Sequence, residues 1–99
     1  MNIVLKRPNE NPVEMDCDPG EGYEEWRKLL KGWVEHVPYD EDIDMYFDDE
    51  GKLKQLAPNF VHPRYRQIVG NVIFASRGQV NPCSLSESQI ERILRQLSQ

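Results

Sequence analysis

A group of basic, amide and aromatic residues in the second half of the chain has the composition of an anion-binding site. Arginine binds phosphate through two parallel N–H groups, tyrosine stacks on a base or a ribose, and asparagine and histidine offer donors and acceptors. The group lies in or beside residues 57–67, whose two prolines predict a loop. The candidate ligand-binding residues are therefore Lys52, Asn59, His62, Arg64, Tyr65 and Arg66.

The charge distribution offers another role for these bases, which is to neutralise the acidic part of the same chain. Residues 1–51 hold 15 of the 17 acidic residues, and seven of the 12 basic residues follow them. The net charge is −5. A protein that binds DNA or an anionic membrane over a broad surface is expected to be basic. We therefore expect neither partner, and a local basic patch suited to a small anion is left.

The two histidines do not form a recognisable catalytic pair. His36 and His62 are far apart in the sequence, and Glu35 precedes His36 on a predicted strand, where neighbouring side chains point to opposite faces. The chain contains no phosphate-binding glycine loop, no Gly-x-Ser-x-Gly elbow and no His-Glu-x-x-His helix. The sequence thus predicts a protein that is not an enzyme, with no catalytic residues and no cofactor.

The acidic run from Asp40 to Asp44 has carboxylates at alternate positions, as a calcium loop does. An EF-hand needs glycine at its sixth position and glutamate at its twelfth, and this chain has Met45 and Gly51 there. No Cys/His spacing of a zinc site occurs either. We therefore expect no metal site, and a solvated acidic face in this region.

Cys17 and Cys83 are the only cysteines, and their spacing is not that of a disulfide framework. The start of the chain lacks the features of a secretory signal. The longest uncharged apolar stretch, residues 68–76, is too short for a membrane span, which needs about 20 residues. These features favour a cytoplasmic protein with free thiols.

The hydrophobic patterns predict a sheet with two helices. Strands are expected at residues 2–6, 13–16, 33–39, 43–48 and 68–75, and residues 52–56 are a candidate return strand. Apolar residues spaced by three and four predict a helix from Glu21 that Gly32 caps, and a second one with Ile90 and Leu97 on its buried face. Ser84 and Glu87 have the spacing of a capping box before the second helix.

These elements give one domain over residues 1–99, of α+β class. Its architecture is a mainly antiparallel sheet of about five strands with two helices packed on it, in the order β-β-α-β-β-β-α. Asp42, Asp44 and Asp48 alternate with Ile43, Met45 and Phe47, so this strand is expected to have one wet and one buried face.

Several short motifs resemble a family of small bacterial and phage proteins described as a domain of unknown function. The matching segments include Asp49-Glu-Gly-Lys-Leu53, Leu56-Ala-Pro-Asn59, Ile68-Val-Gly-Asn-Val-Ile-Phe74, Gly32-Trp-Val-Glu35-His-Val37 and Ser84-Leu-Ser-Glu-Ser-Gln89. The resemblance covers nearly the whole chain. It implies a phage, plasmid or other mobile-element origin and no established activity; phage accessory proteins of this size often counter host defence, some as oligomeric sponges for nucleotide signals.

Two functional hypotheses follow. The first is a non-enzymatic homo-oligomer that sequesters a small phosphorylated nucleotide at the basic loop, in a pocket closed between protomers. The second is an inhibitor of a host defence protein that occupies a nucleic-acid site through an acidic face consisting of Asp40, Glu41, Asp42, Asp44, Asp48 and Asp49.

Overall fold

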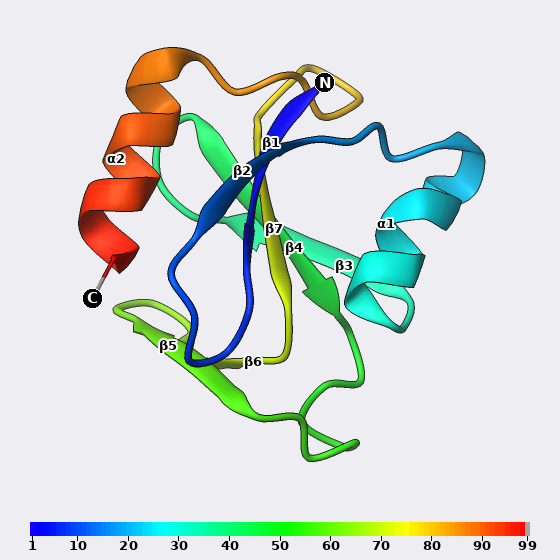
Figure 1. Ribbon diagram of the computed structural model, residues 1–99. Helices are drawn as coiled ribbons and strands as arrows, with labels where there is room; N and C mark the ends of the chain where they lie inside the picture. Colours follow the sequence, from blue (N-terminus) through cyan, green and yellow to red (C-terminus); the bar gives the residue numbers. More distant parts are fainter. Residues whose placement is uncertain (99) are drawn as a thin grey trace.

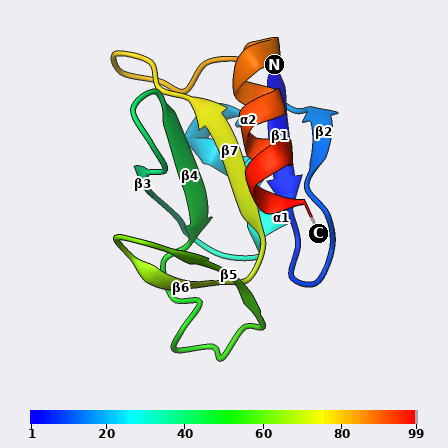
Figure 2. The same cartoon turned by 90° about the vertical axis from the view of Figure 1, so that its left-hand side faces the viewer.

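The computed structural model describes residues 1–98, in which a five-stranded sheet lies between two helical layers (Figure 1). Every strand pair is antiparallel, and the strand order is β2-β1-β7-β4-β3. Helix α1 covers one face, and α2 covers the other, above a separate two-stranded hairpin (Figure 2). The predicted α+β class is confirmed. The elements of the large sheet and the helices are β1 (Asn2–Lys6), β2 (Val13–Asp16), α1 (Glu24–Leu30), β3 (Val34–Pro38), β4 (Ile43–Asp48), β7 (Val72–Ser76) and α2 (Glu87–Leu97).

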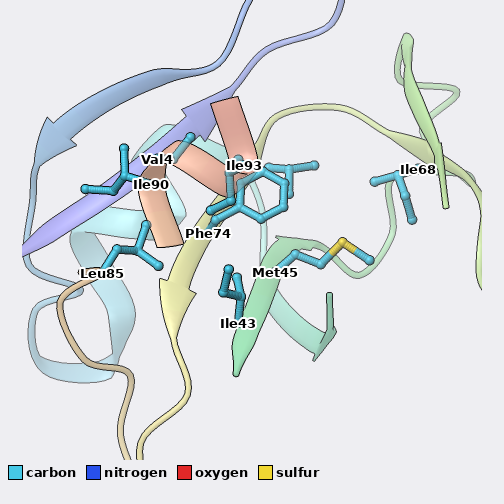
Figure 3. Close-up of a cluster of buried hydrophobic side chains, with 9 residues drawn as sticks. Val4, Ile43, Met45, Ile68, Phe74, Leu85, Ile90 and Ile93 are labelled. Atoms are coloured by element: carbon cyan, nitrogen blue, oxygen red, sulfur yellow. The ribbon is translucent and has the colours of Figure 1, made fainter. Parts of the chain in front are cut away.

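Both faces of the central strands are buried, so two apolar clusters lie back to back across the sheet. On the α2 side, Phe74 packs with residues of β1, β4 and α2 (Figure 3). On the α1 side, Ile73 and Tyr46 pack against Trp26 and Leu30, both of which are buried as the helical spacing predicted. Alternate residues of one strand thus serve different clusters.

The expectation of a wet face on β4 is wrong. Asp44 is 7% exposed and Asp48 is 4% exposed, because the face of β4 that they share with Tyr46 is covered, by α1 over Tyr46 and by Gly32 beside Asp48. Each buried carboxylate has a cationic partner: Arg77 lies 2.8 Å from Asp44, and Lys54 lies 2.7 Å from Asp48. Buried charges require such partners, since leaving water costs several kcal/mol per ion.

Residues 52–67 differ most from the expectations. Residues 52–56 form turns rather than a strand, with Leu56 N–H donating to the Gly51 carbonyl at 3.0 Å. The expected loop over residues 57–67 contains a hairpin of β5 (Pro58–His62) and β6 (Arg66–Val69). Its prolines are compatible with this, because Pro58 begins a strand and Pro63 lies in the connecting turn. The expected strand over 68–75 is interrupted at Gly70, whose φ of 74° turns the chain into the main sheet.

Both helix boundaries also depart in detail from the sequence patterns. A short 3₁₀ turn, Glu21–Tyr23, precedes α1, and Lys31 rather than Gly32 takes the left-handed conformation at its end, with φ of 60°. The capping box of α2 uses Ser86 and Gln89 in place of Ser84 and Glu87. The Ser84 hydroxyl instead accepts a hydrogen bond from the backbone N–H of Asn2 at 2.9 Å.

Candidate functional site

The six candidate ligand-binding residues separate into structural and exposed groups. Asn59 is structural: its amide nitrogen donates to the carbonyls of Lys6 and Gly70, at 2.8 and 2.7 Å, and its oxygen accepts from the Lys6 ammonium at 2.9 Å. Burial lowers the pKa of Lys6. Asn59 thus fastens the small hairpin to the end of β1, and its polar atoms are occupied.

His62 is likewise engaged within the fold. Its Nδ1 accepts from the backbone N–H of Arg64 at 3.1 Å, so Nε2, which lies 2.9 Å from the Tyr39 carbonyl, is the donor nitrogen. The Tyr65 ring packs at 4.8 Å from the imidazole. His62 therefore positions the tip of the hairpin and, through it, the Tyr65 ring.

The two arginines do not lie on one strand, although Arg66 begins β6. Arg64 belongs to the three-residue turn between β5 and β6, and Arg66 follows with φ of 68° opposite His62. A left-handed residue after a three-residue hairpin turn is a common way to close such a loop. Strand alternation therefore gives no reason for the two guanidinium groups to converge. Arg64 lines a hollow beside Asp40 and Glu41, which favours a neutralising role for it.

Lys52 and Tyr65, in contrast, line the same groove. This groove, of about 280 Å³, lies between the edge of the large sheet, the turn over residues 48–53 and strand β6. Its apolar lining comes from three parts of the chain, and its polar lining is mixed in charge. The lining residues are Val37, Phe47, Leu53, Tyr65, Ile68 and Val69, with Glu35, Asp48, Asp49, Gly51, Lys52 and Gln67.

The electrostatics of the groove are set by which of its charges are already paired. Asp48 accepts from the Lys54 ammonium and from the backbone N–H of Glu50, at 2.7 and 3.0 Å. The hydrogen bond to Asp48 raises the pKa of Lys54. The exposed Lys52, Glu35 and Asp49 are then the groove charges that face solvent. A cation, two carboxylates and an aromatic ring suit a planar ligand that carries both an anion and N–H or O–H donors.

Sequence reasoning missed most of this groove. Val37 and Phe47 are recognisable as apolar strand positions, but nothing in their spacing distinguishes a groove wall from a core. Leu53 lies in a turn in place of the candidate return strand over residues 52–56, and its side chain is exposed. The groove depends on the hairpin of β5 and β6, which folds over the edge of the sheet. The two prolines of this segment had predicted a loop there instead of a hairpin.

The acidic residues of the proposed inhibitory face are largely paired within the chain. Arg92 bridges Asp40 and Asp42, at 2.9 and 2.7 Å, and its hydrogen bond holds the pKa of Asp42 below its usual value. Arg77 binds Asp44 and also donates to three backbone carbonyls, those of Asp40, Glu41 and Ile43. These arginines come from α2 and from the end of β7, so the sequence of the acidic run does not predict that its carboxylates are paired.

Cys17 and Cys83 are free, as expected. Among residues 1–98, no group of three or more His, Cys, Asp or Glu side chains is arranged to hold a metal ion. Within the same residues, neither helix has the length and apolar character needed to cross a membrane.

A domain of unknown function, DUF3846, matches residues 1–98, and the chain belongs to this family. No curated protein and no solved structure matches the chain. The expectation of an uncharacterised small-domain family is thereby confirmed, whereas the mobile-element origin stays a proposal.

Proposed function

We propose that the protein is a non-enzymatic binding protein that sequesters a small phosphorylated nucleotide in the groove beneath the small hairpin. The observation that carries this proposal is the convergence of Lys52 and Tyr65 on one groove. Both belong to the sequence-derived set, although they come from a turn and a hairpin that the sequence did not predict.

Each part of the groove matches one part of such a ligand. The apolar walls and the Tyr65 ring offer a surface on which a base can stack, worth about 1–3 kcal/mol per base. The Lys52 ammonium can bind a phosphate at the rim, and the carboxylates of Glu35 and Asp49 can accept hydrogen bonds from base or ribose donors. The mixed charge of the groove favours a nucleotide over inorganic phosphate for this reason.

In its biological setting, we place this activity in a phage or other mobile element, where a homo-oligomer in the host cytoplasm would trap a nucleotide immune signal. Membership in a family of small domains of unknown function is compatible with such a role. Sequestration requires only tight binding and a high copy number, so it suits a groove without a nucleophile and base in contact.

The acidic inhibitor has less support from the geometry. Asp40, Asp42, Asp44 and Asp48 are engaged by Arg92, Arg77 and Lys54, and a charge reversal at Asp44 would unsettle the fold as well as any interface. Glu41, which is exposed and does not line the groove, provides the cleaner test of this second hypothesis.

Equilibrium dialysis against a panel of linear and cyclic nucleotides tests the proposed binding. We expect retention of one ligand class, with intact ligand released when the protein is denatured. Lys52→Gln and Tyr65→Leu should each weaken binding by about tenfold or more, which is ~1.4 kcal/mol. Arg95→Gln removes the same charge from an exposed position on α2 and should bind as wild type.

The paired change Arg64→Lys with Arg66→Lys separates the groove from the basic loop. Binding unchanged by this pair is expected if the groove is the site, because the charge is kept and neither residue lines the groove. Retention of no nucleotide across the panel would overturn the proposal, and so would equal binding by wild type, Lys52→Gln and Tyr65→Leu.

A further inference from the structure

Strand β3 is an outer edge of the large sheet (Figure 2). Its residues Glu35 and Val37 line one side of the groove. Its backbone orientation follows from two hydrogen bonds to the neighbouring strand region. Asp49 N–H donates to the Trp33 carbonyl at 3.0 Å, and Tyr39 N–H donates to the Ile43 carbonyl at 2.7 Å. Since the directions of the backbone N–H and carbonyl groups alternate along a strand, the odd-numbered residues of β3 direct these groups toward β4.

The even residues of β3 therefore direct their backbone groups away from the sheet. Val34 and His36 each present an outward N–H and an outward carbonyl, whereas Pro38 presents a carbonyl alone. Such a row is a template for another strand unless it is blocked. The strand carries no Lys or Arg, and Glu35 is its one acidic residue.

The opposite edge of the sheet is protected in a different way. Cys17 N–H donates to the Met1 carbonyl at 2.9 Å, so by the same alternation Glu14 and Asp16 have outward backbone groups in β2. Their carboxylates are exposed, and two like charges on a strand of four residues oppose pairing with a second copy. Strand β3 is thus the more receptive edge.

We propose that β3 pairs with β3 of a second copy in antiparallel orientation about a two-fold axis at His36. In this register, His36 N–H groups donate to each other's carbonyls, and each Val34 N–H donates to the partner's Pro38 carbonyl. Every outward N–H of the strand then has an acceptor, and Pro38 is required only as an acceptor. The four bonds are self-complementary, as a two-fold interface must be.

The neighbouring registers are less favourable. A two-fold axis at Glu35 also allows four bonds, but it places the two Glu35 carboxylates directly opposite each other. An axis at Val37 pairs His36 with Pro38, and the missing N–H of proline halves the number of bonds between these positions. With the axis at His36, Glu35 lies opposite the partner's Val37.

This register also extends the groove, a consequence that rests on the proposed function. Glu35 and Val37 line the groove, so the partner's Val37 and the partner's Glu35 would continue its wall across the axis. Trp33, which is 63% exposed, would face the partner's Tyr39 and lose solvent contact. Buried tryptophans are frequent anchors of interfaces. The nucleotide site is then completed by both copies.

Sedimentation velocity over a range of protein concentrations tests the interface, with His36→Pro as the variant. Proline removes the outward N–H at position 36 and leaves the bonds to β4 intact. We expect a wild-type dimer and a dimer dissociation constant raised about tenfold or more in the variant. Glu14→Pro makes the matched change on the β2 edge and should dimerise as wild type.

Amide hydrogen exchange tests the same interface without a variant, in case His36→Pro fails to fold. The amides of Val34 and His36 should become protected as the protein concentration rises, while those of Glu14 and Asp16 exchange fast throughout. A wild-type monomer at all concentrations, or Val34 and His36 amides without concentration-dependent protection, would overturn the interface.

Nucleotide binding by the His36→Pro monomer separates this inference from the proposed function. Affinity reduced in the monomer supports a site completed by both copies. Wild-type affinity in the monomer overturns the shared site and leaves the groove as the binding site. A wild-type dimer that binds no nucleotide retains the interface and overturns the proposed function.

Discussion

The Asp48 carboxylate occupies the space into which a side chain at position 32 would project. A Cβ built on Gly32 would lie 2.3 Å from Cγ of Asp48, well inside any real contact distance. Because Asp48 also accepts from Lys54 and from Glu50 N–H, this close approach ties the end of α1 to the turn that forms one wall of the groove.

Gly32→Ala should therefore destabilise the protein. The buried carboxylate has little room to move, and overpacking of this kind typically costs about 1–3 kcal/mol. Urea unfolding measures this cost. Adding Asp48→Ala relieves the clash, so the two changes should be non-additive by about 0.5–3 kcal/mol. A Gly32→Ala melt identical to wild type would contradict the close approach.

Lys31→Gly should have the opposite effect. Lys31 has φ of 60°, a conformation that costs an L-residue about 1–2 kcal/mol and glycine almost nothing. Glycine also loses more chain entropy on folding, which offsets part of this benefit. We therefore expect the free energy of unfolding to rise by about 0.5–1 kcal/mol in thermal or urea melts. Lys28→Gly, inside α1, is the control and should cost about 1 kcal/mol. A loss of stability at both positions would contradict the left-handed conformation of Lys31 at the end of α1.

How far the sequence predicts this molecule depends on whether a pattern is local. The helices and the strands β1 to β4 follow from the spacing of apolar residues, because each helix buries one face against the sheet and the strands carry the apolar residues that the helices cover. The wet face assigned to β4 fails for a non-local reason. Alternating aspartates are typical of a solvated strand, and Arg77, which binds Asp44, comes from a distant part of the chain.

The candidate site shows the same limit. Residue type identified Lys52 and Tyr65, and both reach the groove. Asn59 and His62 have equally suitable chemistry, yet their polar atoms hold the hairpin to β1 and to Tyr39. Tertiary contacts decide which polar side chains form hydrogen bonds within the fold and which remain available to a ligand. Amino-acid composition does not encode these contacts.

Ser86→Ala should destabilise α2 by about 0.5–2 kcal/mol, because it removes the side-chain acceptor for the Gln89 N–H. Ser84→Ala breaks an exposed bond to Asn2 N–H that water can replace, so it should cost less. Thermal melts of the two variants compare these positions directly. A larger loss at Ser84 would place the start of the helix where the sequence pattern put it.

Acid should weaken the fold partly through Asp42. Its pKa in the folded state lies below the ordinary value of 3.8, chiefly because Arg92 donates a hydrogen bond to it. A carboxyl group whose pKa is lower in the folded state stabilises the fold at pH values above its unfolded-state pKa. That stability is lost as the pH falls through the folded-state pKa. Arg92→Leu should lower stability at neutral pH and flatten the decline below about pH 4. Arg95→Leu, on the same helix, should keep the wild-type slope.

Alkali should weaken the fold through Tyr39. Burial, with a further contribution from Asp40, raises the pKa of Tyr39 to about 12 from an ordinary value of 10.0. The folded state therefore resists losing this proton more than the unfolded state does. The stability is fully present below about pH 10 and is lost as the pH rises toward 12. Burial raises the pKa of Tyr46 as well, so its ionisation adds a further loss of stability at high pH.

Tyr39→Phe isolates this contribution. The variant lacks the hydroxyl that donates to Gln96 at 2.7 Å, so it should be less stable at neutral pH. Its stability should then fall less steeply than that of wild type between about pH 10 and pH 12. Urea unfolding at a series of alkaline pH values gives both slopes, and Tyr65→Phe supplies the control at a tyrosine in the groove. Equal slopes for wild type and Tyr39→Phe would mean that the Tyr39 hydroxyl ionises as readily in the folded chain as in the unfolded one, and that its contact with Gln96 of α2 does not shield it.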